Sequence, residues 1–266
     1  MTTLTESMSA VRPARRRRNG PGRATVILVR VSTIVVLLVL WEVTARLFPN
    51  PYIAPPTEVV AQGVPFVLQP LTLIALAQTG IRFVQAFVIV VILGIPIGIL
   101  LGRLHRQSFE ASRDVVNILY ALPLVPFYPI FVLWLGLGAP SEIAFGAIHG
   151  LVPVVLLIMS ASAAVPATLV DAARTMGARA GATTVSVVVP AIRSDVFGAL
   201  KIGTSLCMLG VLLGELMISV DGVGALMAGQ IENHQGPHID ALIIVVCLSV
   251  VVINAVLSAV DRALEP

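Results

Sequence analysis

The sequence predicts an all-α, polytopic membrane protein with six transmembrane helices and with both termini in the cytoplasm. Of its 266 residues, 57% are hydrophobic and only 12% are charged, whereas a soluble domain is about half apolar and a quarter charged. The apolar residues form long continuous runs of about the 20 residues that a spanning helix needs. They do not alternate with period two, which argues against an outer-membrane barrel. The third observation is that the basic residues gather between alternate runs, as the positive-inside rule requires.

The first apolar run follows a basic segment. We expect residues 1–24 to form a disordered cytoplasmic tail next to anionic lipid and 25–266 to form the transmembrane domain. The tail's arginines are Arg12, Arg15, Arg16, Arg17, Arg18 and Arg23. The run behind them is too long for the core of an export signal, and no small-residue cleavage site closes it, so we interpret it as an uncleaved span. The position of these arginines beside a membrane span disfavours nucleic-acid binding.

The remaining runs place the other spans. The six predicted spans cover about residues 25–47, 81–102, 114–137, 142–162, 198–219 and 240–260. With this assignment, fourteen of the 17 Lys and Arg residues fall on one side, which predicts N-in, C-in topology. Arg46 and Arg82 are expected to flank the outer face. The outer connection Pro49–Gly80 contains an apolar stretch, Val59–Leu68, that is too short to span and predicts a surface helix.

The longest cytoplasmic connection, about residues 163–197, is the most informative segment. A mere linker would be short and polar, but this one carries an Ala-rich helical stretch, Ala167–Arg179, and a second apolar stretch that ends at Pro190. We therefore expect it to contact a partner. Its pattern is Asp171-Ala172-Ala173, three residues, Gly177, nine residues, Val187, one residue, Val189 and Pro190.

This pattern resembles the cytoplasmic signature of permease subunits of binding-protein-dependent ABC importers: Glu-Ala-Ala, three residues, Gly, nine residues, Ile, one residue, Leu-Pro. The spacing agrees throughout, and Asp171, Val187 and Val189 are conservative departures. Further segments are similar to the nitrate, sulfonate, taurine and pyrimidine-precursor branch. These are Pro56-Thr57-Glu58-Val59, Leu93–Gly102, Trp134–Gly138, Gly214-Glu215-Leu216 and Asp221-Gly222-Val223-Gly224.

The resemblance implies a type I importer in the cell membrane of a prokaryote. Its partners would be a cytoplasmic ABC ATPase, an extracytoplasmic solute-binding protein, and a second copy of this chain or a sister permease. Asp171, Ala172, Ala173, Gly177 and Pro190 would couple the permease to the ATPase. No cofactor is expected on this chain, because ATP and Mg would be bound by the ATPase. In agreement, the single lysine, Lys201, is not part of a phosphate-binding G-x-x-x-x-G-K-[ST] loop.

Several positions inside the predicted spans are candidates for packing or for the solute pathway. Gly94, Gly98 and Gly102 lie on one helix face, and Gly210 and Gly214 form a second pair of small residues; both patterns favour close helix packing. Pro123, Pro126 and Pro129 predict a third span that is irregular near its start, with either a gate or a simple interruption as the role. Glu215, an acid towards the outer end of the fifth span, is a candidate for the pathway or gate, with a structural hydrogen bond as the alternative.

The main functional alternative is a secondary transporter that works without an ATPase. Such a transporter needs coupling carboxylates near the middle of the membrane and an internal repeat. We find Glu42 and Glu215 as embedded acids and no repeat. A metal site is not expected, because Cys207 and Cys247 lack CxxC spacing and no acid or cysteine completes a set with His234 and His238. No enzymatic motif is visible either.

Overall fold

The computed structural model describes residues 23–264, and all the secondary-structure elements named within that range are helices. Long apolar helices of membrane-spanning length are α1 (Arg23–Leu47), α4 (Pro70–Gly102), α7 (Ala139–Ala164), α11 (Arg193–Ile218) and α13 (Gly236–Ala263). A sixth span is formed if α5 (Arg106–Ala121) and the short helices that follow it are taken together. The all-α polytopic fold is thus confirmed. The predicted basic tail lies outside the described residues, apart from its last two positions.

The second span is longer than predicted. α4 begins at Pro70 and has 33 residues, or about 50 Å, more than the roughly 30 Å of a bilayer's hydrocarbon core. Its first turns carry Thr72, Gln78 and Thr79, which lower the local hydropathy without ending the helix. Arg82 therefore lies inside α4 and is buried beside Asp221 of an outer connection, rather than at the start of the span as predicted.

The third span is a broken helix. α5 begins at Arg106 and ends at Ala121; η2 (Val125–Phe127) and α6 (Tyr128–Leu135) then continue at an angle of 81°. Pro123 has no N–H and holds Leu122 in an extended conformation, with φ −67° and ψ 130°, so the α-helix cannot continue. Pro126 and Pro129 lie in the first turns of η2 and α6, where proline is tolerated. The prolines thus interrupt the middle of the span rather than its start.

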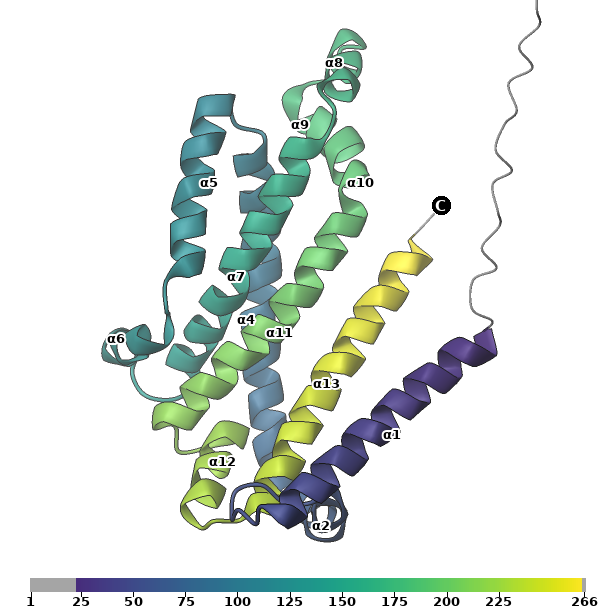
Figure 1. Cartoon of the computed structure of the whole chain (residues 1–266). Coiled ribbons are helices and arrows are strands. Elements are labelled where there is room, and N and C mark those ends of the chain that lie inside the picture. The colour runs from purple at the N-terminus through teal and green to yellow at the C-terminus, as the bar shows by residue number, and fades with distance from the viewer. Residues whose placement is uncertain (1–22, 265–266) are drawn as a thin grey trace, which may run out of the picture.

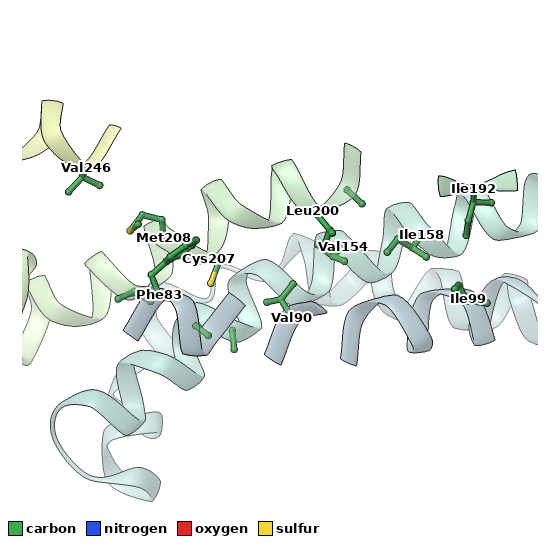
Figure 2. Close-up of a cluster of buried hydrophobic side chains, with 14 of the residues drawn as sticks. Phe83, Val90, Ile99, Val154, Ile158, Ile192, Leu200, Cys207, Met208 and Val246 are labelled. Carbon is green, nitrogen blue, oxygen red and sulfur yellow. The ribbon is translucent and has the colours of Figure 1, made fainter. Parts of the chain in front are cut away.

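The core of the protein is formed by α4, α7 and α11, which pack along most of their lengths. Figure 2 shows the side chains at this contact, including Val90, Val154 and Cys207, which are all fully buried. Glycine permits the close approach: a Cβ at Gly98 would lie 2.8 Å from the Ile158 Cβ. Such packing of small residues is what holds helices together in lipid, where apolar burial alone gives no preference.

α1 lies apart from this core along most of its length (Figure 1), and no residue of its most apolar stretch is buried. It is joined to the rest of the chain at its outer end. There Glu42 accepts hydrogen bonds from Arg46 Nε at 2.6 Å and from the Thr57 backbone N–H at 3.1 Å. The exposed apolar surface of α1 suits contact with lipid.

The outer connections contain more helix than the sequence indicates. The predicted surface helix is present as α2 (Pro56–Glu58), η1 (Val59–Gly63) and α3 (Val64–Val67), and it packs against α13. The connection before α13 holds α12 (Gly222–Glu232), which was not predicted. At the opposite end of the bundle, α8 (Ala167–Thr175), α9 (Ala180–Thr183), η3 (Thr184–Val188) and α10 (Val189–Ala191) join α7 to α11 (Figure 1).

The positions of the basic residues agree with the N-in, C-in topology. The basic residues of the connection after the second span lie at the end of α4 and in α5. Those of the connection between the fourth and fifth spans lie in α8, at the start of α9 and in α11. These segments share one end of the molecule (Figure 1). Arg193 at that end donates to the Leu264 carbonyl, which brings the last turn of α13 to the same side.

Candidate functional site

Two groups of predicted site residues occupy opposite ends of the bundle: Asp171–Pro190 at the cytoplasmic end, and Glu215 near the outer end. We name the first the coupling segment. We name Arg82, Glu142, Glu215 and Asp221, together with Thr79, the charge cluster.

The coupling segment is shaped by its glycine. α8 ends at Thr175, earlier than the predicted Arg179, because Gly177 adopts φ +85°, a left-handed conformation that L side chains rarely adopt. The Ala178 N–H donates to the Ala173 carbonyl at 3.0 Å and the Gly177 N–H to the Arg174 carbonyl at 2.9 Å. This is a glycine C-cap that satisfies the last carbonyls of α8 and turns the chain toward α9.

The coupling segment has an inner face and an outer face. Val170 and Ala173 are buried, whereas Asp171 and Ala172 are exposed on the other side of the helix. No described residue forms an ion pair with Asp171. Met176, with 82% of its surface exposed, extends the outer face beside the cap. An exposed acid next to small and apolar side chains is a surface that a partner with a groove and a basic residue can bind.

Pro190 lies just before the segment joins α11. It occupies the short α10, and the helical geometry is interrupted at Ile192, which has φ −101° and ψ 9° and is 1% exposed. The α8–α10 unit is therefore anchored to the start of α11 through a buried side chain rather than through a flexible linker.

At the outer end, the Glu215 carboxylate is fully buried and fully bonded. It accepts from Arg82 Nη1 at 2.8 Å, from Thr79 Oγ1 at 2.8 Å and from the Gly224 backbone N–H at 2.9 Å. A buried carboxylate is tolerated only with such partners. Because these groups belong to α4, α11 and α12, Glu215 ties three helices together.

The other members of the charge cluster surround the same guanidinium. Asp221 Oδ1 lies 2.5 Å from Arg82 Nη2, and Glu142 Oε2 lies 3.0 Å from Arg82 Nη1. Glu142 belongs to α7 and is 0% exposed, so it is a further embedded acid besides Glu42 and Glu215. The cluster thereby joins α7 to the other helices.

Backbone geometry completes the cluster. Gly222 has φ +90°, and a Cβ there would lie 2.5 Å from the Glu215 carboxylate, so only glycine fits. The Val223 N–H donates to Thr79 Oγ1 at 2.8 Å. The first N–H groups of α12 thus point at a hydroxyl and a carboxylate, which the positive end of a helix favours. Gly214-Glu215 and Asp221–Gly224, quoted above for the resemblance, are parts of this one structure.

The glycines predicted for packing all lie against α7. A Cβ at Gly94 would lie 2.9 Å from Val154 Cγ1, and one at Gly102 would overlap the Met159 carbonyl oxygen. On α11, a Cβ at Gly210 would lie 2.8 Å from the Gly146 Cα, and one at Gly214 would lie 3.4 Å from the Glu142 Cα of α7 and 3.1 Å from the Tyr128 ring of α6.

The outer histidines do not form a site with one another. His238 Nδ1 lies 2.8 Å from Gln230 Oε1 and its ring stacks on Phe66, whereas His234 lies beside Tyr52. Within residues 23–264, no group of three or more His, Cys, Asp or Glu residues is arranged to hold a metal ion.

The charge cluster was missed because Arg82 and Glu142 were each assigned to the ends of spans. A usable signal was present: Arg82 is one of two basic residues assigned to the outer side, the other being Arg46, and the acids Glu142 and Glu215 lie near the outer ends of later spans.

Comparison with known proteins identifies the family. A family described as "Binding-protein-dependent transport system inner membrane component" matches residues 94–266. A Methanocaldococcus jannaschii protein named as an ABC transporter permease is 28% identical over 207 residues, 76% of this chain and 77% of the relative. The formylaminopyrimidine transport permease protein of Halalkalibacterium halodurans is 25% identical, over 87% of this chain and 92% of the relative. The taurine transport system permease protein of Escherichia coli is 24% identical, over 90% of each chain.

A solved structure shares the fold. An inward-facing structure of the MetNI methionine ABC transporter matches with a TM-score of 0.65 and 16% identity, covering 74% of this chain and 97% of that chain. The family match and the permease relatives together show that the chain belongs to the binding-protein-dependent transport system inner membrane component family and is a permease subunit of an ABC importer.

Proposed function

We propose that this permease pairs with a second copy of itself, that a separate cytoplasmic ATPase docks on the coupling segment, and that an extracytoplasmic binding protein delivers a small organic solute. ATP and Mg would be held by the ATPase. The observation that carries the proposal is the coupling segment itself: a capped helix with an exposed acid and small residues, at the cytoplasmic end of the bundle.

The packing supports a mechanical role for this segment. Val170 and Val188 belong to the same buried cluster as Ile192, which adjoins the start of α11. α11 has 26 residues, or about 39 Å, and carries Glu215 near its other end. Movement of an ATPase against α8 would therefore be transmitted along one rigid helix to the charge cluster. For Glu215, the contacts favour a tie between helices over direct contact with solute.

The relatives are named for both organic and inorganic solutes: formylaminopyrimidine, taurine and nitrate. The outer surface of this chain favours the organic class. The outer segments carry Glu58, Glu232 and Asp240, and Arg82 is committed to the charge cluster, so the outer surface does not favour an inorganic anion. The solute class is tested by measuring how much each candidate solute raises the melting temperature of the partner binding protein.

Substitution of Gly177 tests the docking role. No atom lies within 4 Å of a Cβ at Gly177, so the cost of Gly177→Ala comes from its φ of +85°, about 1–2 kcal/mol for a residue with a side chain. Gly181→Ala is the matched control, because Gly181 also has open space but lies in α9 without a positive φ.

We expect Gly177→Ala, and more strongly Gly177→Trp, to reach the membrane in normal amount but to lose ATPase co-purification and substrate-dependent ATP hydrolysis. Gly181→Ala should behave as the wild type does. Normal substrate-dependent hydrolysis in the Gly177→Trp variant would show that the segment is not the docking surface.

A further inference from the structure

A cavity of about 330 Å³ lies at the break between α5 and η2. Its walls are mostly aliphatic side chains from the end of α5, the break, α7 and α11, and its polar members are Tyr120 and His149. His149 is about 15 Å along α7 from Ala139 and about 22 Å from Ala164, close to the middle of the span. Irregular backbone at this depth is tolerated where it is buried in protein or lines a cavity.

The His149 ring is held in one orientation. Its Nδ1 lies 3.0 Å from the Phe145 carbonyl oxygen, and its ring packs edge-on against the Phe145 ring at 4.3 Å between centroids. Gly210 lies directly behind it, since a Cβ there would come within 3.0 Å of the His149 Cβ. The ring therefore has little room to turn.

This contact sets the hydrogen-bonding character of the ring. A carbonyl oxygen only accepts, so we assign the proton of the neutral imidazole to Nδ1, which leaves Nε2 as an acceptor. Within residues 23–264, Nε2 has no hydrogen-bond partner. The half-buried ring thus brings a free acceptor to an otherwise apolar cavity.

The end of α5 adds to this character. Tyr120 and Leu122 line the cavity, and α5 ends between them at Ala121. Since Pro123 has no N–H, the chain cannot donate to the carbonyls of α5 from that position, and the C-terminal end of a helix carries partial negative charge. No Lys or Arg lines the cavity. Both features disfavour an anion and favour a ligand with hydrogen-bond donors.

We propose that this cavity binds solute in transit and that the solute is a small, uncharged heterocycle with N–H donors, of the aminopyrimidine kind, which donates to His149 Nε2. The inference rests on the proposed import of a small organic solute and narrows its class. The volume is at the lower end of the range for ligand pockets and suits a single ring. Nitrate has no donor and would face both the Nε2 lone pair and the end of α5.

The test uses a reporter thiol beside His149 in the full-length chain, assembled with its ATPase in membrane vesicles. Cys207 and Cys247 are first replaced by Ala. Val152→Cys then places a thiol on the cavity wall, and Leu157→Cys, on the same helix but outside the cavity, is the control. The vesicles are treated with a positively charged methanethiosulfonate reagent, which needs water to reach its target, in the presence of 4-aminopyrimidine, nitrate or neither.

We expect the Val152→Cys thiol to react, the Leu157→Cys thiol not to react, and 4-aminopyrimidine but not nitrate to slow the reaction. Adding His149→Phe keeps the ring contact with Phe145 but removes the acceptor. It should raise the concentration needed for protection about fivefold, the equivalent of one hydrogen bond of about 1 kcal/mol. His149→Gln, which restores an acceptor, should recover part of this loss.

An unreactive Val152→Cys thiol, equal protection by nitrate, or unchanged protection with His149→Phe would overturn the inference. Any of these results leaves the Gly177 experiment unaffected. Conversely, normal ATP hydrolysis in Gly177→Trp with protection at position 152 intact would contradict the proposed coupling and not the solute site.

Discussion

Removing the Glu215 carboxylate should destabilise the protein more than any surface charge does. Glu215→Ala deletes the acceptor of Arg82 Nη1 at 2.8 Å, of Thr79 Oγ1 at 2.8 Å and of the Gly224 N–H at 2.9 Å, at a site with 0% exposure. Arg82 keeps Asp221 and Glu142 as ion-pair partners. The buried Thr79 hydroxyl and the Gly224 N–H, however, lose their acceptor, and each unsatisfied buried group costs about 1–3 kcal/mol, so we expect a total cost of about 3–5 kcal/mol. For a chain of this size, the melting temperature should fall by roughly 10 °C.

The assay is thermal unfolding of the purified full-length chain in detergent, with the buried thiol of Cys207 as the reporter of unfolding and Cys247 replaced by Ala. Glu110→Ala is the matched control. Glu110 pairs with Arg106 at 3.1 Å, but the two side chains are 58% and 87% exposed, and such pairs contribute about 0–1 kcal/mol. If Glu215→Ala melts within about 1 °C of the control, the charge cluster does not hold the helices together.

Three further substitutions test the packing and the polar contacts by the same assay. Gly98→Val should lower the free energy of unfolding by about 1–3 kcal/mol, because its side chain meets α7, whereas Gly80→Ala on the same helix has open space and should change it little; equal stabilities would contradict the packing. Thr79→Val keeps the shape but removes the hydroxyl from the charge cluster, which should cost about 1–3 kcal/mol; no change in melting temperature would argue against these hydrogen bonds. Asp240→Asn should cost less, about 1 kcal/mol. In the wild type the Ala54 N–H donates to Asp240 Oδ2 at 2.9 Å, and the amide oxygen of Asn can still accept this hydrogen bond. A loss of stability as large as that for Glu215→Ala would refute this ranking.

The sequence predicts the spans well where a helix is apolar throughout. The first span was expected over 25–47 and is Arg23–Leu47, and the fourth was expected over 142–162 and is Ala139–Ala164. The errors arise where polar residues lie inside a helix. The hydropathy of α4 falls at Thr72 and Gln78, although both belong to a continuous helix that is stabilised by its packing on α7 and α12.

The function was predictable because the coupling segment is a local feature. Asp171, Gly177 and Pro190 lie within twenty residues, so their spacing alone carries the resemblance. The charge cluster was not predictable in the same way. Thr79 and Glu215 are 136 positions apart, and which charges meet across such a separation is decided by the packing of α4, α7 and α11. The prolines did indicate a break in the third span. The break lies in the middle of the span rather than near its start because α5 begins at Arg106, before the predicted residue 114.

The most direct measurement of the central claim is solute uptake into proteoliposomes that contain this chain with or without its ATPase, supplied with ATP and the loaded binding protein. We predict uptake only when the ATPase, ATP and the binding protein are all present, and its loss when the chain carries Gly177→Trp. Uptake by this chain alone, driven by an ion gradient, would contradict the account and would identify a secondary transporter.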